Sequence, residues 1–379
     1  MSGHSTARRY SRLKVRVALA DTLIQLALLA GLAFTPAGAS FAAWVDERFA
    51  SPYVGFVVFA AGYTLVLLAA TLPLDFYSGF VLEHRFGLSN QTLGKWAWQR
   101  VKSFAVALAF GLPLGLAFYA LVRSAGIWWW FPVGILFFGF SVLFAQLAPV
   151  AIFPLFYRFE RIENQALEVR LQALLRSAGL SLQGLYRFDM SRDTRKGNAA
   201  LAGLGRTRRI LLGDTLLENL SENEIEAVVA HEVGHHAHKH LWKTLVVGFL
   251  VELGGLALAA LLHAWWVSRQ GLADLSDLRG FPFLLFVLAF YGQLVGPLLG
   301  ALSRRQEWQA DRYALAHSRA PEALATALQK LQEQNLEDPN PPRWVVWLFH
   351  DHPPISQRVA LIERTVQSEQ QTAVGRETV

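Results

Sequence analysis

The stretch Ala230-His231-Glu232-Val233-Gly234-His235-His236 decides the fold of this 379-residue chain, because it places the pattern H-E-x-x-H between apolar segments long enough to cross a bilayer. Residues four apart lie on the same face of a helix. The imidazoles of His231 and His235 can therefore converge on one tetrahedral zinc ion, and Glu232 can face an attacking water molecule. The sequence thus predicts a zinc protease built into a membrane.

The motif is expected to lie on a helix. Upstream, Ser221-Glu222-Asn223-Glu224 has the S-x-x-E pattern of a capping box, and apolar residues recur at helical spacing after it. An alternative is a histidine-rich, solvated helix end, because His236, His238 and His240 follow the motif and histidines near a helix C-terminus interact favourably with its dipole. That alternative accounts for these later histidines better than for the first two.

A third zinc ligand must come from a different helix. His238 lies on about the same face as His231, but seven residues of helix rise about 10.5 Å, whereas a Zn–N bond is only about 2 Å long. Glu307 and Asp311 are four residues apart, so one helix face presents both carboxylates. Glu307 is predicted to bind zinc, and Asp311 to hold a ligand histidine through its other ring nitrogen. The alternative is an ordinary charged helix face.

The composition is that of an integral membrane protein. Hydrophobic residues make up 53% of the chain and charged residues 17%, against about 25% charged in a soluble domain. Six stretches approach or exceed the roughly 20 residues that cross a bilayer. They are 17–34, 53–74, 104–122, 127–152, 244–267 and 281–302. The chain has no cysteine, which excludes disulfides and thiolate metal ligands.

The first stretch has some features of a signal peptide. Arg8, Arg9, Arg12 and Lys14 precede it, and Ala37-Gly38-Ala39 resembles a cleavage site. Its apolar run, however, is longer than the roughly 7 to 15 residues of such a signal, so a retained membrane anchor is favoured.

Basic residues near the span ends predict the orientation. The N-terminal arm, the second and fourth loops and the C-terminal part are basic, whereas arginines are spread thinly over the opposite loops. Six spans then place both termini, the motif and Glu307 on the cytoplasmic side of the bilayer. The net charge of +6 reflects this bias and contact with anionic lipid. No segment resembles a nucleic-acid-binding module, and the sequence leaves the oligomeric state open.

The chain is predicted to be mainly α, a polytopic membrane protein of about six transmembrane helices with a zincin-like α+β metalloprotease domain on the cytoplasmic side. Its predicted regions are a membrane region with four helices (1–153), a soluble part with a small sheet and the motif helix (154–243), a transmembrane hairpin (244–302), a C-terminal catalytic part with the third ligand (303–367) and a disordered tail (368–379).

The soluble part is expected to hold a helix near 165–178 and strands at 185–190, 198–204 and 208–212, and a later helix is expected near 322–333. A sheet beside the zinc helix gives an extended peptide an edge with which to pair. Asn198-Ala199 is the candidate substrate-binding edge, and the alternative is a turn before a strand.

Together these features resemble the type I CAAX prenyl proteases, integral membrane zinc proteases with bacterial relatives. The matching segments are Phe80-Val81-Leu82-Glu83-His84-Arg85-Phe86-Gly87-Leu88-Ser89-Asn90-Gln91-Thr92, Asn198-Ala199, Asp214-Thr215-Leu216-Leu217, the motif helix, 307–311, His352-Pro353 and Arg358. The resemblance implies a bacterial inner membrane protein with one Zn²⁺ ion per chain. The implied zinc ligands are His231, His235 and Glu307.

The resemblance also implies a reaction: hydrolysis of peptide bonds in membrane-associated or prenylated, CAAX-like proteins. Glu232 is the implied catalytic acid and base, which takes a proton from the attacking water and delivers it to the leaving amine. Asn198, His352 and Arg358 line the implied substrate cleft, and His352 or Arg358 stabilises the oxyanion. For these last two residues the alternatives are a helix cap and a surface cation.

Other functions remain open at this stage. The second enzymatic candidate is a broad quality-control protease of misfolded membrane proteins. A transporter or a catalytically silent membrane scaffold is the alternative from a different class.

Eukaryotic family members have seven spans around a large chamber, whereas six are counted here. Four polar residues at or within the spans either line a water-filled chamber or pair between helices. They are Asp21, Glu252, His263 and Gln293.

Overall fold

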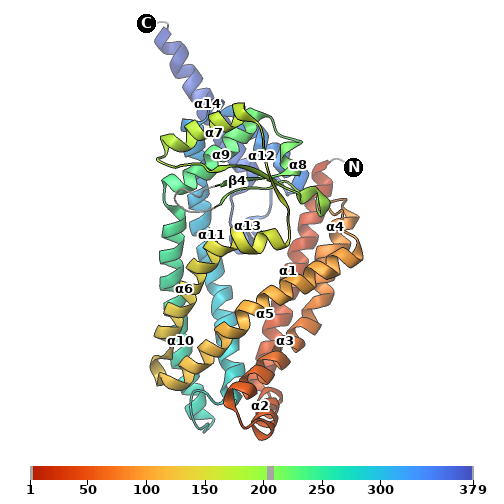
Figure 1. Ribbon diagram of the computed structural model, residues 1–379, viewed down its shortest axis with the longest axis vertical. Coiled ribbons are helices and arrows are strands. Elements are labelled where there is room, and N and C mark those ends of the chain that lie inside the picture. The colour runs from red at the N-terminus through yellow and green to blue at the C-terminus, as the bar shows by residue number, and fades with distance from the viewer. Residues whose placement is uncertain (1–2, 203–208, 378–379) are drawn as a thin grey trace.

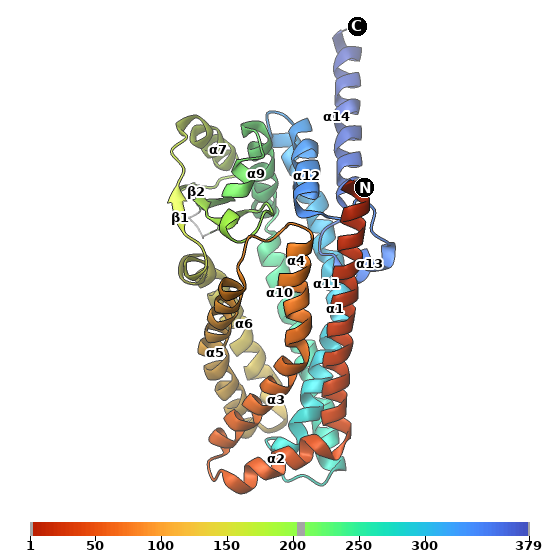
Figure 2. The same ribbon diagram turned by 90° about the vertical axis from the view of Figure 1, so that its right-hand side faces the viewer.

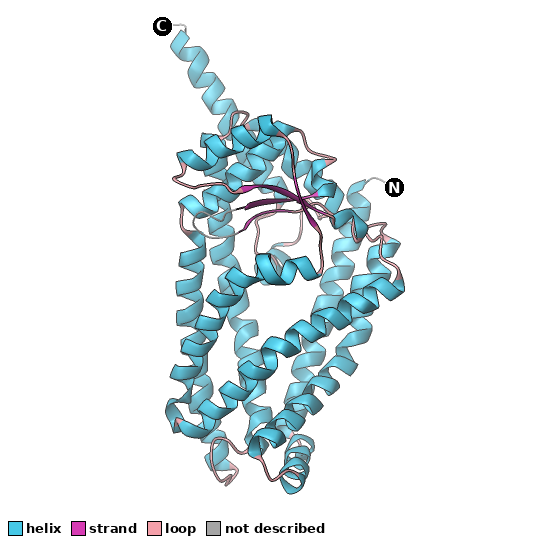
Figure 3. Ribbon diagram, viewed as in Figure 1, coloured by secondary structure: helices cyan, strands magenta, loops and turns pink. Residues whose placement is uncertain are grey.

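The protein has two structural parts. The long apolar helices form what we call the helical part, and the small sheet with its shorter helices forms the α/β part. The computed structural model describes residues 3–202 and 209–377. Long helices fill most of the molecule, and a small sheet with shorter helices covers one end of them (Figure 1, Figure 3). The N-terminus lies at the end that carries the α/β part.

Six helices in the described residues are long and apolar enough to cross a membrane, which confirms the predicted number. The spans are Ser5–Phe34 in α1 (Gly3–Phe34), Pro52–Arg85 from α3 (Pro52–Phe76) to α4 (Leu82–Arg85), Leu93–Ser124 in α5 (Leu93–Ser124), Gly126–Leu155 around α6 (Trp130–Leu147), His240–Arg269 in α10 (His240–Arg269) and Leu278–His317 around α11 (Phe281–His317). Large apolar side chains on these helices face outward, among them Leu65, Leu250 and Leu298, each more than 60% exposed. Such faces fit lipid acyl chains.

Helix α2 (Pro36–Arg48) connects the first two spans without crossing a bilayer. Its 13 residues rise only about 20 Å, less than the roughly 30 Å of the hydrocarbon core. Thr35 caps its N-terminus by accepting a hydrogen bond from the Ala37 backbone amide. Figure 2 shows α2 at the end of the molecule opposite the α/β part.

The sheet of the α/β part has the strand order β1-β2-β4-β3. Its strands are β1 (Phe159–Arg161), β2 (Gly184–Phe188), β3 (Ala199–Ala202) and β4 (Arg209–Gly213). Strands β2 and β4 are parallel, and the outer two strands pair antiparallel to them. A strand lies at each of the three predicted places, but β2 ends at Phe188 instead of 190, because a turn of 3-10 helix begins at Met190. Residues 203–204 and 208 of the predicted strands lie outside the described residues. Strand β1 was not predicted, because three residues are too few to show an alternating pattern.

Six further helices complete the α/β part. They are α7 (Gln165–Ser177), α8 (Asp214–Leu217), α9 (Glu222–Ala237), α12 (Glu322–Asn335), α13 (Arg343–Phe349) and α14 (Ile355–Glu377). The capping box is confirmed, since the Ser221 backbone amide donates to Glu224 Oε2 at 2.7 Å. Of the predicted disordered tail (368–379), residues 368–377 continue α14 as helix, and 378–379 lie outside the described residues. Glutamine, glutamate and alanine in this polar segment are good helix formers.

Helix α9, which carries the H-E-x-x-H motif, packs closely against α11, which carries Glu307. The contact depends on Gly234. A Cβ atom on Gly234 would lie 3.0 Å from both the Ala310 Cα and the Tyr313 Cβ on α11, tighter than ordinary packing allows. Ala310 is fully buried at this crossing. A glycine inside the motif thus lets the two helices that hold the predicted ligands approach each other.

Two of the polar residues within the spans have identifiable partners. His263 is fully buried, and its Nε2 lies 3.0 Å from the Leu275 carbonyl oxygen, so it ties α10 to the following loop. Asp21 accepts a hydrogen bond from Gln25 at 2.7 Å and lines, with Asp75, a pocket of about 510 Å³ between α1 and α3. His263 therefore has a structural contact, whereas Asp21 combines pairing with the lining of a polar pocket.

Replacing Gly234 by valine tests the helix contact. The added atoms collide with α11, and such overpacking typically lowers the free energy of unfolding by about 1–3 kcal/mol. The matched control is Gly248→Val on α10, where a Cβ meets no atom within 4 Å. Thermal unfolding in detergent, followed by circular dichroism, should show a lower midpoint for Gly234→Val only. Equal midpoints for the two variants would contradict the packing argument.

Candidate metal centre and substrate cleft

Three side chains from α9 and α11 converge on one point. His231 Nε2 lies 3.3 Å from Glu307 Oε2, and His235 Nε2 lies 3.2 Å from Glu307 Oε1. The two Nε2 atoms are 3.2 Å apart. The ligand atoms of His231, His235 and Glu307 all lie within 4.8 Å of one another. The structure thus brings together the three residues that the sequence predicted as zinc ligands.

The surroundings of Glu307 fit a metal ion. Its side chain is only 3% exposed, and its Oε2 atom is buried without a hydrogen-bond partner in the described residues. A buried carboxylate oxygen in that state is costly unless a cation completes its surroundings. Two imidazoles and one carboxylate are also the donor set of catalytic zinc sites, which keep a fourth position open. The residues present therefore fit a catalytic divalent metal.

Asp311 holds His231 in the orientation that a metal ligand needs. His231 Nδ1 lies 2.9 Å from Asp311 Oδ1, so its proton is fixed on Nδ1 and Nε2 is free to face the metal. Burial disfavours protonation of His231, but hydrogen bonding to Asp311 and Glu307 outweighs that effect and raises the pKa of the imidazole to about 9. The same carboxylates favour a metal cation at the position of the proton.

Arg358 in turn holds Asp311. Its Nε and Nη2 atoms donate to the two Asp311 oxygens at 2.8 and 2.6 Å, and its Nη1 lies 3.5 Å from Glu307 Oε2. The guanidinium is almost fully buried, and its residue is 6% exposed. This two-pronged pairing fixes the plane of the Asp311 carboxylate. Arg358 is therefore neither a surface cation nor a group free to swing toward a substrate.

His240 orients the second histidine ligand, a contact that the sequence did not predict. Its Nδ1 lies 3.1 Å from His235 Nδ1, and its Nε2 lies 2.8 Å from Gln309 Oε1. A consistent proton arrangement has His235 donate from Nδ1 and His240 donate to Gln309, which leaves His235 Nε2 free. The contact between His240 and His235 depends on Lys239, because its φ of 55° turns the chain sharply between α9 and α10.

His352 lies at the open side of the metal centre. Its Nε2 is 3.4 Å from Glu307 Oε1, and its Nδ1 is 2.7 Å from Asp351 Oδ1. The side chain is 56% exposed, unlike the ligands beneath it. The hydrogen bond to Asp351 raises the pKa of His352 above its usual value; burial opposes the rise, and the Glu307 charge adds to it. An imidazolium is thereby favoured where a substrate can reach it.

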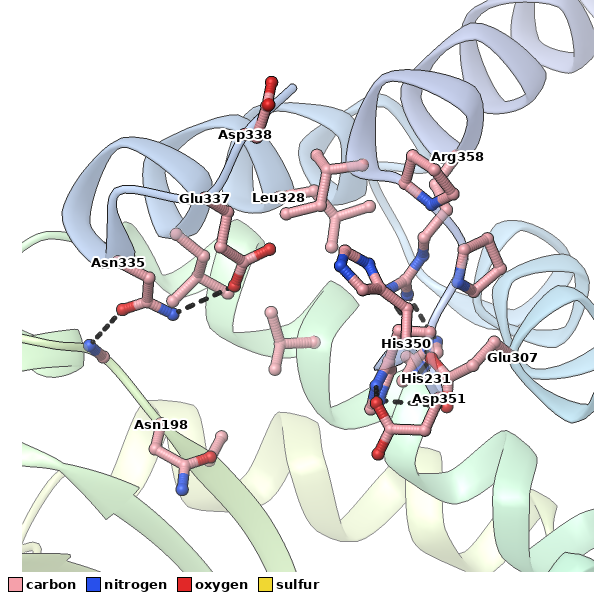
Figure 4. A pocket seen from close by; sticks show the side chains of 18 of the residues that line it. Asn198, His231, Glu307, Leu328, Asn335, Glu337, Asp338, His350, Asp351 and Arg358 are labelled. Carbon is pink, nitrogen blue, oxygen red and sulfur yellow. Dashed lines mark hydrogen bonds and ion pairs between the residues drawn. The ribbon is translucent and has the colours of Figure 1, made fainter. Parts of the chain in front are cut away.

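A cleft of about 460 Å³ opens over these residues. Figure 4 shows His231, Glu307 and Arg358 on one side and Asn198 across from them. Glu232 and Ala199 also line the cleft. Apolar side chains from α12 and the segment after it form part of the wall; they are Leu324, Leu328, Leu331 and Leu336. Every predicted catalytic and substrate-binding residue lies on this cleft, while His235 and Asp311 lie behind it.

Strand β3 is at the edge of the sheet and is anchored to the membrane helices. Lys196, three residues before the strand, lies 2.9 Å from Glu83 Oε2 on α4. The buried Glu83 also accepts a hydrogen bond from the Tyr10 hydroxyl at 2.6 Å and pairs with Lys14 at 3.2 Å, both on α1. This buried charge cluster fixes the segment that leads into Asn198. The candidate peptide-binding edge is thus held relative to the helical part.

Two family models together cover nearly all of the chain. The model of peptidase family M48 matches residues 161–366. The model described as the CAAX prenyl protease N-terminal region, with five membrane helices, matches residues 2–158. In that second range the described residues hold four candidate spans, and α2 is too short to be a fifth.

Relatives from bacteria and eukaryotes match over most of their length. The chain is 30% identical over 325 residues to the uncharacterized metalloprotease YhfN of Bacillus subtilis, covering 85% of this chain and 76% of that one. It is 29% identical over 311 residues to a CAAX prenyl protease 1 homolog of Oryza sativa, covering 81% and 73%. The crystal structure of S. mikatae Ste24p superposes with a TM-score of 0.82 at 25% identity, covering 95% of this chain and 89% of the other.

The role of Asp311 is testable by the isosteric change Asp311→Asn. The amide cannot hold His231 as strongly or pair with Arg358 as an ion, and loss of such a supporting carboxylate typically weakens metal binding about 10- to 100-fold. The control is Asp46→Asn, an exposed residue on α2 at the far end of the molecule. Zinc affinity is measured by competition with a chromogenic chelator. Unchanged affinity in Asp311→Asn would refute this assignment.

Proposed function

This chain belongs to peptidase family M48 and is a membrane metalloendopeptidase of the CAAX prenyl protease 1 type. We propose that it cleaves membrane-associated peptides with one zinc ion at the cluster of His231, His235 and Glu307. The observation that carries the proposal is the buried Glu307 carboxylate, which faces two imidazoles across distances of 3.2 and 3.3 Å. That arrangement, together with the family, favours an enzyme over a silent scaffold or a transporter.

Zinc is the metal that this donor set suits best. The two histidines and Glu307 supply three ligands, and the chain has no cysteine that could close the site with a thiolate. When bound there, zinc supplies Lewis acidity, which polarises the scissile carbonyl and acidifies a water molecule. The ligands contribute orientation, because His231 and His235 are each fixed through the other ring nitrogen.

Glu232 is the proposed general base and acid. It follows the first ligand on α9, is half-buried, and lines the cleft with His231 and Glu307. From that position it takes a proton from the attacking water and later returns it to the leaving amine.

His352 and Arg358 have different proposed roles. The exposed imidazolium of His352 lies at the open side of the centre and stabilises the developing oxyanion. Arg358 is a positioning residue, since both prongs of its guanidinium are engaged by Asp311. The sequence left the choice between His352 and Arg358 open for stabilisation of the oxyanion. The geometry favours His352 for that role.

The substrate is proposed to lie along β3. In the described residues, β3 pairs with β4 on one side only, and Asn198 and Ala199 both line the cleft. An extended peptide added to this edge passes Glu232 and the metal ligands. Prenylated, CAAX-like proteins are the first candidates, because several relatives carry the name CAAX prenyl protease 1. Broad quality control of misfolded membrane proteins is the second.

We also propose a bacterial inner membrane location with both termini and the cleft in the cytoplasm. The arginines at the start of α1 lie at the same end of the molecule as the α/β part (Figure 2). Positively charged segments of this kind are retained on the cytoplasmic side.

Two glutamate variants separate chemistry from metal binding. Glu232→Gln should retain zinc and lose at least about 100-fold in turnover, since a general base contributes about that much or more. Glu307→Gln should lose zinc together with activity, because it removes a ligand charge. Zinc content by mass spectrometry and cleavage of a fluorogenic peptide are measured on the same preparations. Normal turnover by zinc-loaded Glu232→Gln would rule out the mechanism.

A substrate panel distinguishes the two candidate specificities. Purified wild-type protein and Glu232→Gln are incubated with farnesylated CAAX peptides, the same peptides without the prenyl group, and an unfolded membrane-protein reporter. CAAX-type processing predicts a clear preference for the farnesylated peptides. Cleavage of the reporter without prenyl dependence would instead support quality control, and the variant identifies any contaminating protease.

A further inference from the structure

A second pocket, lined by arginines, lies beside the substrate cleft. Four of its arginines belong to one face of α1, at positions 8, 9, 12 and 16, and Arg85 at the end of α4 also lines it. The pocket has a volume of about 680 Å³ and is bordered by Pro339 and Asn340. We call these five arginines and their pocket the arginine groove. Among the described residues, no acidic side chain lines it.

The charges of the arginine groove are almost uncompensated. Arg8 lies 3.7 Å from Asp338, a long ion pair with an arginine that is 50% exposed. Among the described residues, the side chains of the other four arginines form no ion pair or hydrogen bond, and all four are exposed. Five cations gathered at one pocket repel one another, so a nearby anion would stabilise the arrangement.

The groove lies at the height of lipid headgroups. Arg16 immediately precedes the apolar run from Val17 to Phe34, whose 18 residues match a hydrocarbon core of about 30 Å. The eight residues back to Arg8 rise about 12 Å along α1. Headgroups occupy roughly 5–7 Å on each side of the core, which places Arg12 and Arg16 among them.

We propose that the arginine groove binds the phosphate of an anionic phospholipid headgroup. The guanidinium groups match phosphate geometry, and the acyl chains would continue along the apolar side of α1 into the bilayer. A lipid is favoured over an acidic peptide because the arginine row descends to the start of the membrane span. The site is separate from the metal centre, although Arg8 and Asp338 connect it to the wall of the substrate cleft.

The test compares two variants with the same loss of charge. Arg12→Gln/Arg16→Gln removes two arginines from the groove, whereas Arg176→Gln/Arg364→Gln removes two exposed arginines from α7 and α14. Delipidated full-length protein is titrated with phosphatidylglycerol or phosphatidylcholine, and the bound lipid is counted by native mass spectrometry. Zinc content and helicity are checked to show that both variants are folded.

Wild type and the Arg176/Arg364 control should bind the first phosphatidylglycerol alike, and Arg12→Gln/Arg16→Gln should bind it roughly 30-fold more weakly, at about a fivefold loss per arginine. Phosphatidylcholine should not distinguish the three proteins. Equal phosphatidylglycerol affinities, or the same loss in the control, would overturn the proposal. Displacement of the lipid by inorganic phosphate or by an acidic peptide at equal concentration would overturn the assignment to a lipid.

Discussion

The close crossing of α9 and α11 is the constraint on which the rest of the site depends. Each helix presents a pair of polar groups four residues apart: two imidazoles on α9, and Glu307 and Asp311 on α11. Neither pair forms a metal site alone, because one straight helix cannot surround an ion. Gly234 allows the approach that brings the polar atoms of the two pairs within 2.9–3.3 Å of one another. The packing of the two helices therefore controls the geometry of the site. A larger residue in place of Gly234 would move the two pairs apart, even though all four side chains would still be present.

The same two helices fix the height of the centre relative to the bilayer. Helix α11 is one continuous helix of 37 residues from Phe281 to His317, so the apolar span and Glu307 belong to a single rigid element. On the other side, Lys239 turns α9 directly into the span of α10. The Glu83 cluster adds a third connection, from α1 and α4 to the segment before β3. The candidate metal centre and the candidate peptide edge therefore lie at a fixed distance from the membrane, which suits the membrane-associated substrates proposed above.

What could be predicted from the sequence is what depends on local periodicity. Helix spacing revealed the ligand pairs, apolar length revealed the six spans, and the S-x-x-E pattern revealed the start of α9. Contacts made by turns and long-range packing could not be read in this way. His240 was assigned to a solvated helix end, because its role depends on the left-handed conformation of Lys239, a rare state for a residue with a Cβ. Arg358 was a candidate for contact with the oxyanion, because sequence does not show that Asp311 engages it.

The buried charged groups around the candidate metal centre carry a net negative charge, which favours a bound cation. Glu307 and Asp311 are two buried carboxylates, and Arg358 is the single buried guanidinium between them. These three groups leave one negative charge uncompensated, and hydrogen bonding to the two carboxylates raises the pKa of His231 despite its burial. Counted with these three buried groups alone, a divalent cation would turn the deficit into an excess of one positive charge. Burial makes such an excess costly unless an anion is close, and in the proposed reaction the peptide oxyanion is that anion. In the proposed mechanism, the arrangement that would bind the cation therefore also favours the transition state, with the proposed contribution of His352 from the exposed side.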